Sequence, residues 1–156
     1  MADLRLAPAP PEEAREISAQ RPIRVVLADD HAFMRRGLRL LLEGEDGLEV
    51  IAEAEDLRSV TEHVRRDRPA VLVLDLRMPG GSGTETISHL RAEVPGTQIV
   101  ALTMEADRRF AQKALHSGAL GFVLKDLADS ELPMAIRAAA RGEQYVSPRV
   151  AVRRRH

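Results

Sequence analysis

Short runs rich in valine, leucine and isoleucine alternate five times with segments of helical period. The runs are Ile23 to Asp29, Leu48 to Ala54, Ala70 to Asp75, Thr97 to Thr103 and Ala119 to Leu124. Because these runs lack a polar face, each predicts a strand that is buried on both sides. Strands that alternate with helices in this way form a parallel sheet with helices on both faces.

Apolar residues at helical spacing fill the intervals between these strands. The five sets are Met34, Leu38, Leu41 and Leu42; Leu57, Val60, Thr61 and Val64; Ile87, Leu90 and Val94; Phe110, Ala111, Ala114 and Leu115; and Leu132, Ile136 and Ala139. The last helix is expected to run from about Glu131 to Arg141. Pro133 is tolerated only in the first turn of a helix, so Ser130 is the expected N-cap.

Polar residues stand at the carboxyl ends of four of the predicted strands. Asp29 and Asp30 end the first strand, Asp75 the third, Thr103 the fourth and Lys125 the fifth. Open parallel sheets bind ligands outside the carboxyl ends of their strands, where the strand order reverses. The predicted fold is therefore α/β, a flavodoxin-like (βα)5 doubly wound parallel sheet of order 2-1-3-4-5. Its crevice lies between the first and third strands.

Three carboxylates in one crevice predict a bound cation, because like charges at close range repel and raise one another's pKa values. Oxygen ligands without matching histidine or cysteine indicate Mg²⁺, which is held by one or two carboxylates together with phosphate oxygens. Thr103 and Lys125 would contact a transferring phosphoryl group, and Asp75 is the best placed nucleophile for an aspartyl phosphate. Asp30 is also suited to cap the following helix, and the two roles are compatible.

The composition limits the functions that such a site can serve. The chain has 156 residues, of which 44% are apolar and 30% charged, with no cysteine and a net charge of -1. It predicts one domain without disulfides or thiolate metal sites, and no general attraction to nucleic acid. No apolar run approaches the roughly 20 residues of a membrane span. The lack of a signal-peptide core predicts a cytoplasmic protein.

The two ends of the chain differ from the alternating part. In residues 1–22, Pro8, Pro10 and Pro11 precede a charged stretch, and this segment is expected to form a flexible tail. Residues 23–141 are predicted to form the folded domain. Residues 142–156 end in three arginines and a histidine and are expected to form a C-terminal linker or tail.

The residues at the strand ends resemble those of the receiver domain of two-component response regulators. The resemblance covers about Ile23 to Arg141 and rests on Ala28-Asp29-Asp30-His31, Leu74-Asp75-Leu76-Arg77-Met78-Pro79-Gly80, Leu102-Thr103 and Gly121-Phe122-Val123-Leu124-Lys125. It implies that Asp75 accepts a phosphoryl group from a sensor histidine kinase, with Thr103 and Lys125 contacting that group. It implies Mg²⁺ as the cofactor, with four ligands: Asp29, Asp30, Asp75 and the backbone carbonyl of Arg77.

The finer pattern is similar to the NarL/FixJ branch of this family, which is also called LuxR-type. It comprises Ala28-Asp29-Asp30-His31 at the first strand, Leu124-Lys125-Asp126 after the fifth strand and Ala135-Ile136-Arg137-Ala138 through Gly142 to Ser147-Pro148. Members of this branch continue into a DNA-binding helix-turn-helix, which this sequence lacks. The resemblance therefore implies transcription as the output, through a domain outside this chain, and no direct contact of this chain with nucleic acid.

The resemblance also implies how the signal is passed on. Phosphorylation would draw Thr103 inward, and Phe122, as an aromatic rotamer switch, would turn into the vacated space. The face made by the fourth helix, fifth strand and fifth helix is the expected place for a homodimer.

Other functions remain open as alternatives. An aspartyl-phosphate hydrolase would have a second acid two residues after the nucleophile, where this chain has Arg77, so at most slow self-dephosphorylation is expected. A flavin or nucleotide carrier would have a phosphate cradle after the first strand, where Asp29-Asp30 repel phosphate unless a metal intervenes. A stand-alone receiver would act through protein contacts alone, and a degenerate receiver would serve only as a binding surface.

Overall fold

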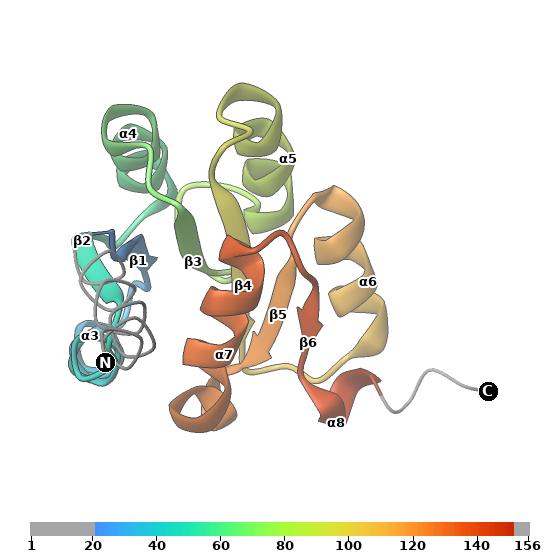
Figure 1. Cartoon of the computed structure of the whole chain (residues 1–156). Helices are drawn as coiled ribbons and strands as arrows, with labels where there is room; N and C mark the ends of the chain where they lie inside the picture. Colours follow the sequence, from blue (N-terminus) through green and yellow to red (C-terminus); the bar gives the residue numbers. More distant parts are fainter. Residues whose placement is uncertain (1–20, 152–156) are drawn as a thin grey trace, which may run out of the picture.

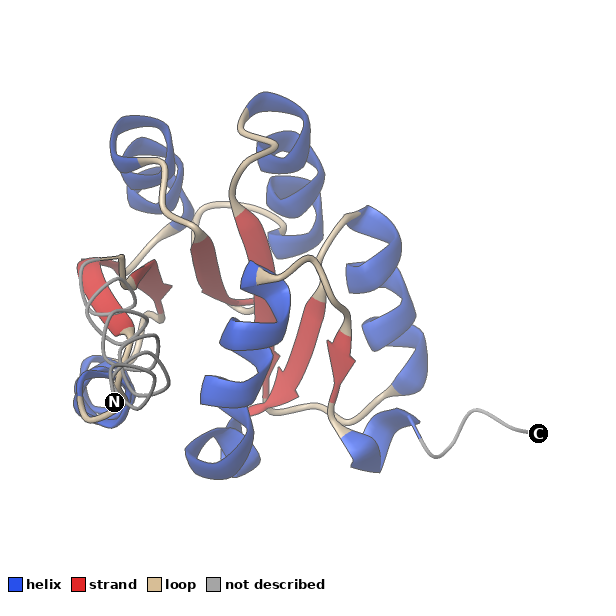
Figure 2. Cartoon of the chain, in the orientation of Figure 1, coloured by secondary structure: helices blue, strands red, loops and turns tan. Residues whose placement is uncertain are grey.

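A parallel sheet forms the centre of the computed structural model, which describes residues 21–151 (Figures 1 and 2). The strands are β1 (Ile23–Ala28), β2 (Leu48–Ala54), β3 (Val71–Asp75), β4 (Gln98–Thr103), β5 (Gly121–Leu124) and β6 (Tyr145–Val146). Their order is β2-β1-β3-β4-β5-β6, and each neighbouring pair is parallel. The predicted order 2-1-3-4-5 is confirmed, and β6 adds a strand that was not predicted.

Helices cover both faces of this sheet and enclose two apolar cores. One face is covered by α3 (Ala32–Glu43) and α7 (Ala128–Ala140), and the other by α4 (Leu57–Asp67), α5 (Gly83–Glu93) and α6 (Arg108–Ser117). Alternate residues of β3 point into the two cores: Leu72 and Leu74 on one side, Val71 and Val73 on the other. The strands are therefore buried on both sides, as their apolar runs predict.

The start of the last long helix differs from the prediction. Ser130 is not the N-cap, because α7 already begins at Ala128, directly after the 3-10 turn η1 (Lys125–Leu127). The Ser130 hydroxyl instead donates to the carbonyl of Leu127 at 3.2 Å. Pro133 consequently lies inside the helix and not in its first turn. The prediction was wrong because a tight turn continues directly into the helix and moves its start towards the N-terminus.

The chain after α7 returns to the edge of the sheet. β6 pairs with β5, and the short helix α8 (Pro148–Ala151) follows it. The backbone N–H groups of Tyr145 and Ser147 donate to the carbonyls of Leu120 and Phe122, each at 2.9 Å. A strand of two residues has no measurable periodicity, which is why the sequence pattern did not reveal it.

Some predictions concern residues that the structure does not describe. The tail predicted for residues 1–22 lies outside the described residues except for its last two positions, and residues 152–156 are also outside. Among residues 21–151, every helix is too short or too polar to cross a membrane.

Candidate functional site

An ion-paired cluster lies where the carboxyl ends of β1, β3 and β5 meet. Asp29 directly follows β1 and Asp75 ends β3, and both are buried, at 0% and 1% exposure. Lys125, the first residue after β5, places its Nζ 3.0 Å from Asp29 Oδ2 and 2.9 Å from Asp75 Oδ2. Asp29, Asp75 and Lys125 are far apart in the sequence but lie together, because the parallel strands end at the same edge of the sheet.

The charge of Lys125 is stabilised by these two aspartates. Burial by itself would lower the pKa of Lys125, since a low-dielectric surrounding disfavours the ammonium form. The interactions with Asp75 and then Asp29 outweigh burial and raise the pKa above its ordinary value of 10.5. The ammonium therefore stays charged at neutral pH and separates two carboxylates that would otherwise repel each other.

Tight turns after each strand fix the orientation of both aspartates. Asp29 Oδ1 accepts a hydrogen bond from the backbone N–H of His31 at 2.8 Å, and Asp75 Oδ1 accepts one from the N–H of Arg77 at 2.9 Å. Such bonds from a residue to the backbone two positions later are typical of Asx turns. In each case one carboxylate oxygen is held by the backbone and the other faces Lys125.

Asp30 and His31 lie beside this cluster and complete a set of atoms suited to a cation. One ligand atom from each of Asp29, Asp30, His31 and Asp75 lies within 4.8 Å of the others. Asp30 Oδ1 is buried without a hydrogen-bond partner, and Asp29 Oδ2 contacts Lys125 only as an ion pair. A buried carboxylate oxygen without a donor is unfavourable unless a cation neutralises it. The residues present therefore fit a metal ion, and their oxygen atoms suit Mg²⁺.

The structure also shows what these two residues do not do. α3 begins at Ala32 with His31 at the N-cap position and no capping side chain, so Asp30 does not cap this helix. His31, to which the sequence assigned no role, has an exposed imidazole whose Nδ1 lies 3.2 Å from Asp30 Oδ1. Its position directly after two aspartates was the only feature of the sequence that could have placed His31 at the site.

The two predicted switch residues are both fully enclosed. Thr103 ends β4 at 0% exposure, and its hydroxyl accepts a hydrogen bond from the backbone N–H of Glu105 at 3.2 Å. Phe122 in β5 is also at 0% exposure, and its ring packs edge-to-face against Phe110, with centroids 6.4 Å apart. Any turn of the Phe122 ring therefore requires neighbouring side chains to move.

The side chain of Arg77 connects two loops at the site. Its guanidinium pairs with Glu105 after β4 and lies 6.0 Å from the centroid of the Phe110 ring in α6. The sequence indicated a role only for the backbone carbonyl of Arg77. The pairing with Glu105 could not be predicted, because the two residues are far apart in sequence and opposite charges on loops are common.

A second ion-paired group supports the end of β1. Arg35 in α3 donates to the backbone carbonyl of Asp29 at 2.5 Å and to Glu53 of β2 at 2.9 Å. Arg39 pairs with the same Glu53 carboxylate. Burial would raise the pKa of Glu53, but the hydrogen bonds from Arg39 and Arg35 outweigh it and lower the pKa below its ordinary value near 4.5. Glu53 thereby orients the arginine that holds the Asp29 backbone.

The substitution Glu53→Gln is expected to lower the free energy of unfolding by about 1 kcal/mol at pH 7. A lowered folded-state pKa stabilises the fold above the unfolded pKa, and this stabilisation is lost as the pH falls through the folded value. The difference between the two proteins should therefore shrink below pH 4.5. Urea denaturation across pH measures it. Glu49→Gln, an exposed position on the same strand, is the matched control, and a difference independent of pH would contradict the explanation.

Residues 25–137 match the response regulator receiver domain. The chain belongs to this family. A solved receiver-type protein, the two-component response regulator of the LuxR family from Aurantimonas sp. SI85-9A1, is 37% identical with a TM-score of 0.80, covering 84% of this chain and 94% of that one. The signal receiver domain of the putative response regulator NarL from Mycobacterium tuberculosis is 31% identical with a TM-score of 0.75, covering 79% and 99%.

Sequence similarity to a curated relative indicates the branch of the receiver family to which the chain belongs. The oxygen regulatory protein NreC of Staphylococcus epidermidis is 40% identical over 125 residues, which are 80% of this chain and 57% of NreC. The chain thus spans somewhat more than half of that relative. Together with the LuxR-family and NarL structures, this confirms the predicted resemblance to the NarL/LuxR-type branch of two-component response regulators. Receiver domains are signalling modules and not conventional enzymes.

Proposed function

We propose that this receiver domain accepts a phosphoryl group on Asp75 from the phosphohistidine of a sensor kinase and changes conformation in response. The observation that carries the proposal is the buried contact of Asp75 with Lys125, next to a carboxylate oxygen of Asp30 that has no hydrogen-bond partner. A buried nucleophile, a fixed cation and a carboxylate that could bind a metal ion are parts that phosphoryl transfer uses.

The chemistry of the transfer follows from the positions of these groups. A carboxylate oxygen of Asp75 attacks the phosphorus, the P–N bond to the kinase imidazole breaks, and the leaving imidazole takes up a proton from solvent. Lys125 Nζ, 2.9 Å from Asp75 Oδ2, is placed to pair with an oxygen of the new phosphoryl group. The Thr103 hydroxyl, at the end of the neighbouring strand, supplies a further hydrogen bond once the loop after β4 moves inward.

The metal ligands proposed from the resemblance agree with the chemistry of the donor set. Asp29, Asp30, Asp75 and the backbone carbonyl of Arg77 would hold Mg²⁺, which supplies charge neutralisation for the transferring phosphoryl group. Asp30 is the most accessible of the three aspartates, with its side chain 28% exposed, so it lies on the solvent side of the site.

The position two residues after Asp75 supports slow loss of the phosphoryl group. Arg77 stands there, and its guanidinium pairs with Glu105. Because a guanidinium stays protonated in proteins, it cannot activate a water molecule as a general base. We therefore expect at most slow self-dephosphorylation, and not the turnover of a phosphatase.

The output that we propose is transcriptional control through a DNA-binding domain outside this chain. NreC is described as a regulatory protein, and the chain matches somewhat more than half of it. Acting through protein contacts alone is the second possibility. A homodimer through α6, β5 and α7 is the proposed assembly, and the structure adds that β6 lies along the outer edge of β5 on this face.

Incubation with acetyl phosphate tests the phosphorylation itself. With Mg²⁺, intact-mass measurement should show one phosphoryl group per chain, because the metal ligands and Lys125 then act together. With excess EDTA the phosphorylated fraction should fall to background. Equal phosphorylation in both conditions would contradict the role of the metal, and no phosphorylation in either would contradict the proposed function.

A further inference from the structure

The segment from Tyr145 to Ala151, called the strap below, covers the outer edge of β5 (Figure 1). It contains β6 and α8. Its backbone N–H groups donate to the carbonyls of Leu120 and Phe122, so the strap serves as the neighbouring strand on the outer side of β5. An uncovered strand edge presents free backbone groups that bind other chains. The strap therefore occupies a position where a partner strand could dock.

A buried hydrogen-bonded clasp fastens the strap to the end of β5. Ser147 Oγ accepts a hydrogen bond from the backbone N–H of Leu124 at 3.1 Å and donates one to Glu131 Oε1 in α7 at 2.5 Å. Ser147 is at 0% exposure and Glu131 at 8%. Leu124 immediately precedes Lys125, so the clasp holds the backbone from which the Asp75-paired ammonium extends.

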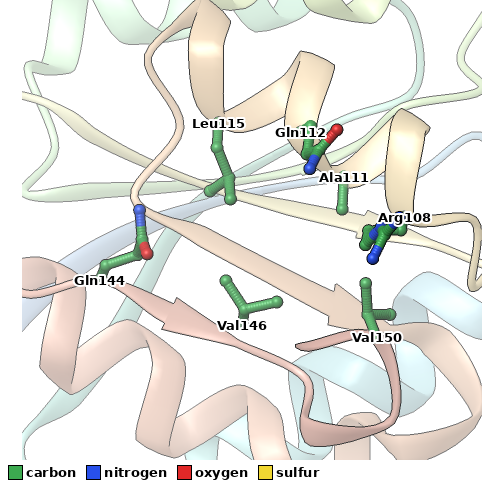
Figure 3. Close-up of a pocket in the computed structure, with 7 residues that line it drawn as sticks. All are labelled: Arg108, Ala111, Gln112, Leu115, Gln144, Val146 and Val150. Atoms are coloured by element: carbon green, nitrogen blue, oxygen red, sulfur yellow. The ribbon is translucent and has the colours of Figure 1, made fainter. Parts of the chain in front are cut away.

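A pocket open to solvent lies between the strap and α6. It has a volume of about 330 Å³, with Ala111 and Leu115 of α6 on one side and Val146 and Val150 of the strap on the other (Figure 3). Val150 itself is buried, at 1% exposure. The strap therefore packs against α6 over only part of its length, and the hydrogen-bonded clasp and the buried Val150 also hold it.

The strap contacts Phe122, the residue expected to turn on phosphorylation. Phe122 pairs with Val146 across the β5–β6 ladder, and both belong with Val150 to the same apolar core. If Phe122 turns when Asp75 is phosphorylated, its packing against the strap must change. We expect this change to weaken the hydrogen bond between Leu124 and Ser147 at the end of the same strand.

Resting on the proposed function, we propose that docking of the strap and phosphorylation of Asp75 oppose each other. Phosphorylation releases the strap from β5, and the docked strap in turn disfavours phosphorylation, because coupling between two sites is reciprocal. Release uncovers the edge of β5 and the apolar side chains of Val146 and Val150. The face made by α6, β5 and α7 thereby becomes available only after phosphorylation.

Hydrogen exchange measured by mass spectrometry tests the coupling in the unaltered chain. Addition of beryllofluoride and Mg²⁺, which mimic the phosphoryl group, should slow amide exchange in the loop after Thr103. It should accelerate exchange in the strap by about tenfold or more. Slower loop exchange with unchanged or slower strap exchange would overturn the coupling and leave the proposed function intact. Unchanged exchange in both would overturn both, and acceleration that persists in Asp75→Ala would overturn the coupling.

The variant Ser147→Ala tests whether loosening the strap promotes phosphorylation. Loss of the hydroxyl should accelerate strap exchange without any mimic and raise the initial rate of phosphorylation by acetyl phosphate about fivefold or more. Ser130→Ala, an exposed serine on α7, is the matched control and should leave that rate unchanged. A rate equal to that of the wild type in a folded Ser147→Ala protein would overturn the proposal.

Discussion

Replacing Asp75 by alanine is expected to abolish phosphorylation, from one phosphoryl group per chain with acetyl phosphate and Mg²⁺ to none. Asp75 ends β3, contacts Lys125 at 2.9 Å and accepts a backbone hydrogen bond from Arg77. Asp29 makes the matching contacts after β1, so the resemblance to receiver domains, and not the contacts alone, assigns the acceptor role to Asp75. Removing its carboxylate removes the proposed nucleophile. Intact mass of both proteins after incubation is the measurement.

The variant should remain folded, because Lys125 keeps Asp29 as a partner at 3.0 Å. Asp129→Ala, which removes an exposed aspartate in the first turn of α7, is the matched control and should be phosphorylated as the wild type is. A phosphoryl group on Asp75→Ala at the wild-type level would show that another residue is the acceptor. The proposed mechanism would then be wrong.

Replacing Lys125 by methionine is expected to cause the largest loss of stability, about 3–5 kcal/mol in the free energy of unfolding without Mg²⁺. Methionine keeps the length and apolar stem of the side chain but removes the charge. Asp29 and Asp75, both buried, are then left without the cation that separates them. Urea denaturation in EDTA measures the loss.

The sequence offers a matched control for this substitution, because Lys113 in α6 is the other lysine of the chain and is exposed. Lys113→Met should change the unfolding free energy by less than about 0.5 kcal/mol. Saturating Mg²⁺ should restore part of the stability of Lys125→Met, since a bound cation replaces the missing charge. Stability of Lys125→Met equal to that of the control in EDTA would contradict the electrostatic role of Lys125.

Much of the fold could be predicted because strands that are buried on both faces consist almost entirely of apolar residues. Val71 to Leu74 are apolar without alternation, and between segments of helical period such a run indicates a strand that is covered by helices on both faces. The tight turn before α7 and the two residues of β6 could not be predicted, because neither is long enough to show a repeating sequence pattern.

The sequence likewise predicts some parts of the site and not others. Asp29, Asp75 and Lys125 could be grouped because the topology of a parallel sheet brings strand ends together. The pairing of Arg77 with Glu105 and the clasp of Ser147 with Glu131 depend on side-chain directions from separate loops and helices. Neither the spacing nor the composition of the chain encodes those directions.

The ammonium of Lys125 between Asp29 and Asp75 means that the domain carries its own counter-ion. Small zinc-dependent domains unfold when their metal is removed, because the ligands have no other stabilising partner. In this receiver domain the internal cation separates folding from metal loading. Removal of divalent ions should silence the site without unfolding the chain, so the supply of Mg²⁺ can regulate signalling independently of how much folded protein is present.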